Sequence, residues 1–376
     1  MEELKKLRYK LHQIPEISGN EKRTSEEILA FLNQYPPSEV ISSIGGNGIL
    51  ALFKGEEKGK SVLFRCELDA LPIEEINIFQ HKSMHKGVSH KCGHDGHMSI
   101  LCGLARKLFQ NPIKKGTVGL LFQPAEENGN GAAAVISDSK FEFFKPDYAF
   151  ALHNLPGFPL HQIIIKENAF TCAVNSIIIK LKGKTAHAAE PENGINPALA
   201  ISEIINHFNS KIQPDITLQD YCVITPIYIA MGEKAYGVSA GYGEVHFTLR
   251  SDSNLFMKQM EKDLTATATQ IAIQHNLQSD IEWTEKFQAN ENDSKAVDIV
   301  RTAAKACNLN LFEKDTPFTF GEDFGLITQH FKGAMFGIGA GEESPSLHNP
   351  DYDFPDEITD TGIQLFYQIT KEIIDA

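Results

Sequence analysis

Apolar residues recur at helical spacing near the N-terminus. Leu4, Leu7 and Leu11 lie three or four positions apart, and Ile28 and Leu32 repeat this spacing further along the chain. Residues spaced in this way share one face of a helix, so the pattern predicts two N-terminal helices. Comparable patterns predict later helices over residues 196–208, 255–275, 296–307 and 357–374.

Short continuous apolar runs lie between the predicted helices. They cover residues 61–66, 118–122, 148–152 and 334–338. Runs of this length are typical of strands that are buried on both faces, as in a sheet covered by helices. The sequence therefore predicts an α/β fold built on a helix-covered mixed sheet.

The pattern changes in the middle of the chain. Strand-like runs over residues 176–181, 221–229 and 243–250 alternate there with two of the predicted helices, which indicates an inserted α+β layer. We place the catalytic domain at residues 1–173 and 286–376 and the inserted domain at residues 174–285. A half-covered sheet needs a second surface for its apolar face, so the inserted domain is predicted to serve as a lid and to join two copies in a homodimer.

Composition and charge exclude several classes of partner. The 376 residues, of which 42% are hydrophobic, are enough for two globular domains. A net charge of -14 argues against nucleic acid as a partner. No run of about 18 apolar residues and no apolar signal core occurs, so we expect no membrane contact and a cytoplasmic protein. The six cysteines are scattered along the chain, which indicates reduced thiols.

Polar donor side chains follow three of the predicted strands. Glu67 and Asp69 come after the first strand, Glu126 and Glu127 after the second, and His153 directly after the third. Open α/β sheets place their sites beyond the carboxyl ends of the strands, so we expect these side chains to converge at one edge of the sheet.

The run Cys92-Gly93-His94-Asp95-Gly96-His97 is the strongest chemical signal. A thiolate, two imidazoles and a carboxylate, separated by glycines that allow tight turns, suit a transition metal held in a loop. The adjacent carboxylates of Glu126 and Glu127 strengthen this prediction, because one can bind the metal while its neighbour faces the bound water. Four histidines are given no place in the metal set: His97 is interpreted as structural or supporting, and His81, His85 and His90 as part of a solvated polar stretch.

Seven motifs in order along the chain resemble the di-metal aminoacylase and carboxypeptidase family of zinc peptidases. The similarity is to the branch of hippurate hydrolase, indole-acetyl-amino-acid hydrolase and N-acetyldiaminopimelate deacetylase. The motifs are Leu11–Glu16, Arg65–Pro72, the Cys92 run, the Glu126 cluster Gln123–Asn128, Leu152–Asn154, Gly321–Phe324 and Leu347–His348.

The resemblance implies a role for each of the matching residues. Two metals would be held by Cys92, His94, Glu127, His153 and His348, with Cys92 bridging them. Glu126 would be the general base, and Asp69 would orient a ligand histidine. His187 would reach a neighbouring subunit's site and steady the oxyanion, and Arg250 would hold the carboxylate of the substrate.

The chain also departs from the pattern of this branch. Glu67 stands where aspartate is usual, Glu192 where a second histidine usually follows Pro191, and Asn196 where aspartate is common. Gly237 replaces the usual asparagine of the lid. These changes leave the metal set intact and put the substrate class in doubt.

We therefore expect a metal-dependent amidohydrolase that cleaves an N-acyl amino acid or a similar small amide. Two divalent ions are expected; the mixed thiolate, imidazole and carboxylate set favours Zn²⁺, and Mn²⁺, Co²⁺ or Ni²⁺ also suit it. One alternative is a dipeptidase or carboxypeptidase with the same centre. Another is a metal-binding relative without turnover, against which Glu126 argues, because no metal needs it as a ligand.

Overall fold

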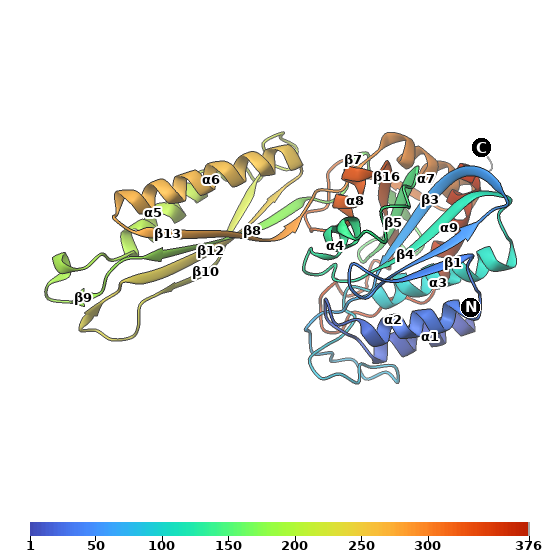
Figure 1. The fold of residues 1–376 in the computed structure, drawn as a ribbon, viewed down its shortest axis with the longest axis horizontal. Coiled ribbons are helices and arrows are strands. Elements are labelled where there is room, and N and C mark those ends of the chain that lie inside the picture. The colour runs from blue at the N-terminus through green and yellow to red at the C-terminus, as the bar shows by residue number, and fades with distance from the viewer. Residues whose placement is uncertain (375–376) are drawn as a thin grey trace. The chain divides into compact units, whose positions relative to one another are not determined.

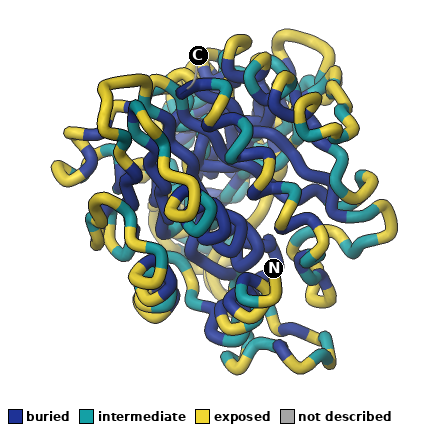
Figure 2. Tube along the Cα trace, turned by 90° about the vertical axis from the view of Figure 1, so that its right-hand side faces the viewer, coloured by how far each residue is buried: buried dark blue, intermediate teal, exposed yellow. Residues whose placement is uncertain are grey.

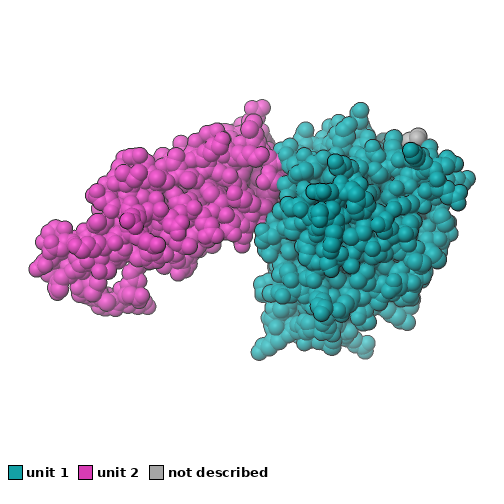
Figure 3. Space-filling model, viewed as in Figure 1, with its two compact units in different colours: residues 1–170, 290–315, 322–376 teal, residues 171–289, 316–321 magenta. Residues whose placement is uncertain are grey.

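The computed structural model describes residues 1–374, which form two compact units (Figures 1 and 3). The first unit contains residues 1–170 and 290–315 and the chain from residue 322 onward. The second unit contains residues 171–289 and 316–321. The first unit is thus discontinuous in sequence, and the second is inserted into it.

An eight-stranded mixed sheet forms the centre of the first unit. Its strand order is β1-β2-β4-β3-β5-β16-β6-β15. Four neighbouring strands, β4, β3, β5 and β16, are parallel, so their carboxyl ends share one edge of the sheet. The bounds are β1 (Glu39–Ile44), β2 (Gly48–Lys54), β3 (Glu57–Glu67), β4 (Lys115–Gln123), β5 (Tyr148–Leu155), β6 (Ile163–Ile165), β15 (Leu311–Glu313) and β16 (Gly333–Gly339).

Helices cover both faces of this sheet (Figure 1). On one face lie α1 (Glu2–Gln13), α2 (Lys22–Leu32), α3 (His94–Gln110), α7 (Ser294–Ala306) and α9 (Ile358–Ile374). The shorter α4 (Gly131–Ser137) and α8 (Phe324–His330) pack on the other face, and β7 (Asn168–Ala169) pairs with β14 (Glu291–Asn292) beside the sheet. The predicted helix-covered mixed sheet is confirmed.

Aromatic and aliphatic side chains fill the space between the sheet and the helices. Phe64 on β3 is fully buried, and its ring centroid lies 4.6 Å from that of Phe366 on α9. The strands and the inner helix faces are dark blue in Figure 2, whereas the exposed positions follow loops and outer helix faces. Burial of this apolar surface fixes the sheet, and with it the edge at which the parallel strands end.

The second unit is an α+β layer, as predicted. Its antiparallel sheet has the order β10-β12-β8-β13, and α5 and α6 pack on it around one apolar core. The bounds are β8 (Ala173–Lys182), α5 (Ala198–Asn209), β10 (Val223–Met231), β12 (Tyr242–Ser251), α6 (Asn254–Gln274) and β13 (Gln278–Phe287). A small ribbon joins β9 (Ala186–His187) to β11 (Val238–Ser239), and a 3₁₀ turn follows at Pro191–Asn193.

Several elements were not predicted. Strands β1 and β13 carry many polar, partly exposed residues and lack a continuous apolar run. Helix α3 contains Gly96 and Gly103, which weaken the helical signal. Gly96 is needed for close packing, because a Cβ there would lie 2.3 Å from the ring of Phe354. Over residues 1–374, no helix is long and apolar enough to cross a membrane.

Candidate metal centre

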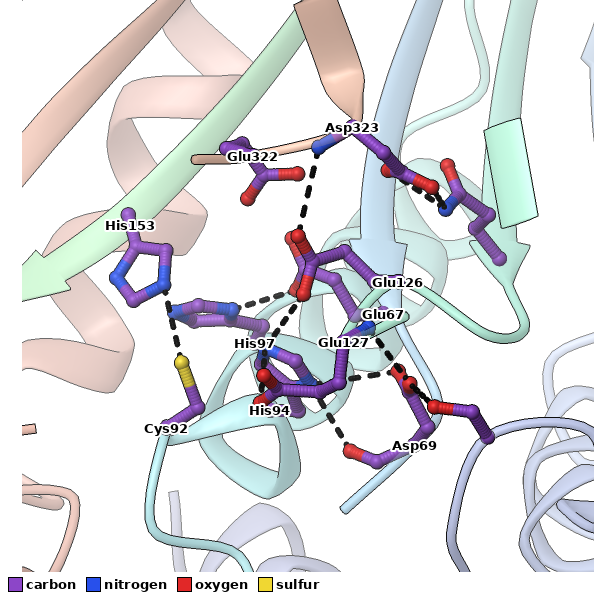
Figure 4. Close-up of polar contacts among 12 residues, drawn as sticks. Glu67, Asp69, Cys92, His94, His97, Glu126, Glu127, His153, Glu322 and Asp323 are labelled. Atoms are coloured by element: carbon purple, nitrogen blue, oxygen red, sulfur yellow. Dashed lines mark hydrogen bonds and ion pairs between the residues drawn. The ribbon is translucent and has the colours of Figure 1, made fainter. Parts of the chain in front are cut away.

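The donor side chains gather at the carboxyl edge of the parallel strands (Figure 4). Glu67 ends β3, and Asp69 follows it by two residues. Glu126 and Glu127 follow the end of β4, and His153 lies near the end of β5. The segments after these strands and after β16 therefore supply the site, as expected from the strand order.

The Cys92 run is a loop only as far as Gly93. Gly93 adopts a left-handed backbone (φ 94°), a conformation that costs glycine little, and His94 then begins α3. His94 and His97 therefore lie in the first turn of a helix, where the prediction was a loop. The helix fixes both imidazoles more rigidly than a loop would.

One ring nitrogen of His94, Nδ1, donates a hydrogen bond to the protein backbone. Its Nδ1 lies 2.9 Å from the backbone carbonyl of Asp69, and since a carbonyl only accepts, Nδ1 must carry the hydrogen. Nε2 is buried, makes no hydrogen bond and lies 3.9 Å from a carboxylate oxygen of Glu127; in the neutral ring it offers a lone pair. This is the state in which a histidine binds a metal.

His153 is arranged in the same way. Its Nδ1 donates to the carbonyl of Asn154 at 2.9 Å, and its Nε2 lies 3.4 Å from Cys92 Sγ. Burial lowers the pKa of His153 to about 3, so its imidazole is neutral. Nε2 therefore presents a lone pair toward the thiol.

Glu127 and His348 complete the set. An oxygen of Glu127 lies 3.9 Å from His348 Nε2, and the Glu127 N–H donates to the Asp69 carboxylate at 2.9 Å. The backbone of His348 is left-handed (φ 65°), and its N–H donates to the carbonyl of Lys91 at 2.8 Å. A non-glycine residue in this conformation is strained, which often marks a functional position.

The spacing of these donors fits metal ions. Two ligands of one tetrahedral zinc ion, each about 2.0–2.3 Å from it, lie about 3.3–3.8 Å apart. Cys92 belongs to two groups of donors whose ligand atoms lie within 4.8 Å of one another, one with His94 and His153 and the other with Glu127 and His348. The residues therefore fit two ions with Cys92 between them.

The pKa values of the acidic groups at this site also fit bound cations. Burial, followed by the charges of Glu322 and Glu127, raises the pKa of Glu126 well above its usual range. Burial raises the pKa of Glu127 to about 7, although His94 opposes the rise, and burial also raises that of the Cys92 thiol. Burial thus favours the protonated forms of these groups, and divalent cations would stabilise the deprotonated forms that bind metal.

Glu126 lies close to the ligands, because its carboxylate forms a further group with His94 and Glu127 whose donor atoms are within 4.8 Å of one another. It is 5% exposed, and one oxygen accepts weakly from the N–H of Asp323 at 3.4 Å. Its other oxygen is 3.9 Å from His94 Nε2. The left-handed backbone of Ala125 (φ 53°) turns the chain sharply just before this residue.

A buried ion network lies behind Glu126. Arg65 pairs with Glu67, with Glu322 at 2.9 Å and with Asp323 at 2.5 Å. The amide of Gln123 donates to both oxygens of Asp323, at 2.9 and 2.8 Å. The motif Gly321–Phe324 and Arg65 were noted in the sequence without a role, and the structure places them around the candidate base.

His97 uses both ring nitrogens within the protein. Nδ1 lies 2.6 Å from the carboxylate of Glu67, and Nε2 accepts from the N–H of Asn154 at 3.3 Å. This leaves no lone pair for a metal, in agreement with a supporting role. Glu67 reaches His97 although aspartate is usual at its position.

The interpretation of His81, His85 and His90 as solvated is wrong for two of the three. His81 is buried between the rings of Tyr9 and Phe79, each 3.8 Å away, and His90 is 1% exposed. His85 is half-buried. Both rings also pack against helix α1, through Tyr9 for His81 and through His12 for His90, so the local polar pattern gave no sign of this burial.

His187 and Arg250 belong to the second unit. His187 is exposed on β9, and it pairs with Val238 on β11, next to Gly237. Arg250 is half-buried, and its Nη1 donates to the carbonyl of Thr319 at 2.7 Å. His187 and the lid residue Gly237 thus lie close together. The roles of His187 and Arg250 stay predictions.

Comparison with known proteins finds relatives that are similar over nearly the whole chain. A model of the peptidase family M20/M25/M40 matches residues 63–372. An N-acetyl-L-cysteine deacetylase from Bacillus subtilis is 29% identical over 371 residues, covering 98% of this chain and 88% of the relative. An N-acetyldiaminopimelate deacetylase from Exiguobacterium sibiricum is 30% identical over 357 residues, covering 95% of each.

Solved structures agree with this likeness. A dinuclear metal-binding peptidase of the M20 family from Bacillus subtilis superposes with a TM-score of 0.83 at 26% identity, covering 100% of this chain and 98% of that one. A putative aminohydrolase from methicillin-resistant Staphylococcus aureus has a TM-score of 0.89 at 22% identity, covering 99% and 96%, and shows the same fold.

We predict that Cys92→Ser weakens metal binding by at least about tenfold, because a hydroxyl is a poorer ligand than a thiolate. Cys307→Ser is the matched control, since Cys307 is partly exposed at the C-terminal end of α7, where its Sγ contacts the carbonyl of Gln364 at 3.9 Å. Competition with a chelating dye measures both affinities. Equal affinity in Cys92→Ser and the native protein would remove Cys92 from the ligand set.

Proposed function

The chain belongs to the peptidase family M20/M25/M40, and we propose that it hydrolyses the amide bond of N-acylated amino acids at a dinuclear centre. It is a metal-dependent amidohydrolase. The observation that carries the proposal is the position of Glu126: a buried carboxylate beside five donors that fit two metals without it. A protein that only bound metal would not need this residue.

We assign the ions to Cys92, His94, Glu127, His153 and His348. Bound divalent ions would lower the pKa of a water molecule and polarise the amide carbonyl. Thiolate and imidazole donors favour Zn²⁺, and Mn²⁺, Co²⁺ or Ni²⁺ are the alternatives. The hydrogen bonds from His94 and His153 to backbone carbonyls hold both rings in the tautomer that binds metal.

Glu126 is the proposed general base. Its raised pKa suits a carboxylate that takes a proton from water and later gives it to the leaving nitrogen. Asp323 holds one of its oxygens through a backbone N–H, and Arg65 fixes Asp323 in turn. The carboxylate of Asp69 holds the backbone of Glu127, and its carbonyl orients His94.

N-acetyl amino acids are the proposed substrates. Curated relatives that match nearly the whole chain are deacetylases of N-acetyl-L-cysteine and of N-acetyldiaminopimelate. Hydrolysis should be measured for both compounds, for an N-benzoyl amino acid and for a dipeptide, with each of the four metals. A preference for the dipeptide would favour a dipeptidase, and no turnover of any of them would contradict the proposal.

We predict that Glu126→Gln retains both metal ions and loses turnover by about 10²- to 10⁴-fold, the usual contribution of a positioned base. Glu127→Gln, its neighbour in the same turn, should instead lose metal. Metal content and hydrolysis are measured on the same samples. Loss of metal from Glu126→Gln would exchange the roles of the two residues.

Arg250 is proposed to hold the substrate carboxylate. Its guanidinium can form two parallel hydrogen bonds to a carboxylate, which a lysine cannot, and Gly237 supplies no amide to share the task. Arg250→Lys should therefore raise KM about tenfold or more for N-acetyl amino acids and change KM little for their carboxamides. Equal changes for both substrate types would show that Arg250 supports the fold through Thr319.

We also propose a homodimer formed through the second unit, in which His187 would serve a partner subunit. Strand β10 is an unpaired edge on which Ile227, Ile229 and Met231 are 61%, 52% and 43% exposed. Apolar edge strands of this kind pair with another chain unless they are covered. A cytoplasmic location is part of the proposal, because all six cysteines are present as thiols and not as disulfides.

Ile229→Lys should convert the dimer to a monomer at micromolar concentration, because it places a charge on the edge strand. Ile273→Lys is the control, since Ile273 is 61% exposed on α6 of the same unit. Sedimentation velocity reports both. A native protein that sediments as a monomer would contradict the dimer, and a dimeric Ile229→Lys protein would place the contact elsewhere.

A further inference from the structure

His12 belongs to the Leu11–Glu16 motif, to which the proposed reaction gives no role. It lies on α1 and is fully buried. Nδ1 is 2.9 Å from a carboxylate oxygen of Asp95, and Nε2 is 3.0 Å from a carboxylate oxygen of Glu75. A neutral imidazole can donate through only one nitrogen, so two carboxylate partners require both nitrogens to carry hydrogen. The geometry is that of an imidazolium.

This imidazolium belongs to a row of alternating charges, here called the ion row. The row runs Lys91, Glu75, His12, Asp95, Arg8, Asp353. Lys91 Nζ lies 2.6 Å from the Glu75 oxygen that His12 also contacts. Arg8 Nη1 lies 3.0 Å from the Asp95 oxygen that His12 contacts and 2.9 Å from Asp353.

The ion row is joined to the backbone that carries the proposed ligands. Lys91 immediately precedes Cys92, and Asp95 immediately follows His94. The carbonyl of Lys91 accepts the N–H of His348 at 2.8 Å. Lys91 Nζ also donates to the carbonyl of Tyr352 at 2.7 Å, which ties it to the segment beyond His348.

We propose that His12, as an imidazolium, is a positioning residue for the metal centre. By bridging Glu75 and Asp95 it fixes the segment 91–95, and with it Cys92 and His94. Through the carbonyl of Lys91 it also fixes His348. The proposal rests on the metal centre of the proposed function, and it assigns the N-terminal motif a role in building that centre.

The surroundings of His12 support the charged state. Burial lowers its pKa, but the charge and hydrogen bond of Asp95 and the hydrogen bond of Glu75 outweigh this and raise the pKa to about 9. The rings of His81 and His90 lie 5.3 and 6.3 Å from the ring of His12. Without His12, two buried carboxylates would share one cation fewer.

His12→Gln should weaken metal binding by about 10- to 100-fold, the usual effect of losing a group that holds a ligand in place. In the cobalt-substituted protein it should also shift the thiolate-to-metal absorption band, which reports the geometry at Cys92. His85→Gln is the matched control: His85 lies in the loop that carries Glu75, donates to the carbonyl of Pro15 at 2.7 Å and takes no part in the ion row.

A second variant separates charge balance from simple loss of packing. Glu75→Gln removes one anion, so the double variant with His12→Gln leaves two cations and two anions in the ion row. Its loss of metal affinity should be smaller than the product of the two single losses. Losses that multiply would show that the two residues act independently, and would overturn the proposed bridge.

Two outcomes distinguish this inference from the proposed function. If the native protein binds no cobalt through a thiolate, the metal centre itself fails. If it does, and His12→Gln keeps native affinity and the native absorption band, only the role of His12 is overturned. Should His12→Gln not fold, nitrogen NMR of the native protein at pH 7.5 still decides: two protonated ring nitrogens are expected, and a neutral His12 ring contradicts the proposal.

Discussion

Burial of several acidic groups at one edge of a sheet is the constraint on which this structure depends. Glu126, Glu127 and Cys92 lie together with little access to water, and each has a raised pKa. Buried anions are tolerated only when they are paired, protonated or bound to a cation. Divalent ions would stabilise the deprotonated forms of these three groups.

Two clusters of buried ion pairs lie beside this centre. Their cations balance part of the negative charge of the buried carboxylates. Arg65 joins Glu67, Glu322 and Asp323 behind the candidate base. The ion row around His12 lies behind the segment that bears Cys92 and His94. Each cluster connects segments far apart in sequence, so the same contacts that neutralise charge also fix the distances between donors. Rigid placement of this kind is what a catalytic metal site requires.

The sequence predicted the four parallel strands of the first unit, because β3, β4, β5 and β16 are continuous apolar runs, and polar donors lie at or just after the ends of β3, β4 and β5. It also predicted which donors gather, since parallel strands bring their carboxyl ends together. Helix α3 was missed because Gly96 weakens the helical pattern. A glycine is needed there, since a Cβ would collide with the ring of Phe354. The burial of His81 and His90 was missed because both rings pack against His12, which lies far away in the sequence, and no local pattern reveals such a contact.

Crystallographic anomalous scattering from the zinc-loaded protein tests the central claim most directly. We predict two peaks per chain, one near Cys92, His94 and His153 and the other near Cys92, Glu127 and His348, with Glu126 outside the coordination of both. A single peak, or two peaks away from Cys92, would contradict the dinuclear centre. Direct coordination of Glu126 would contradict its role as the base.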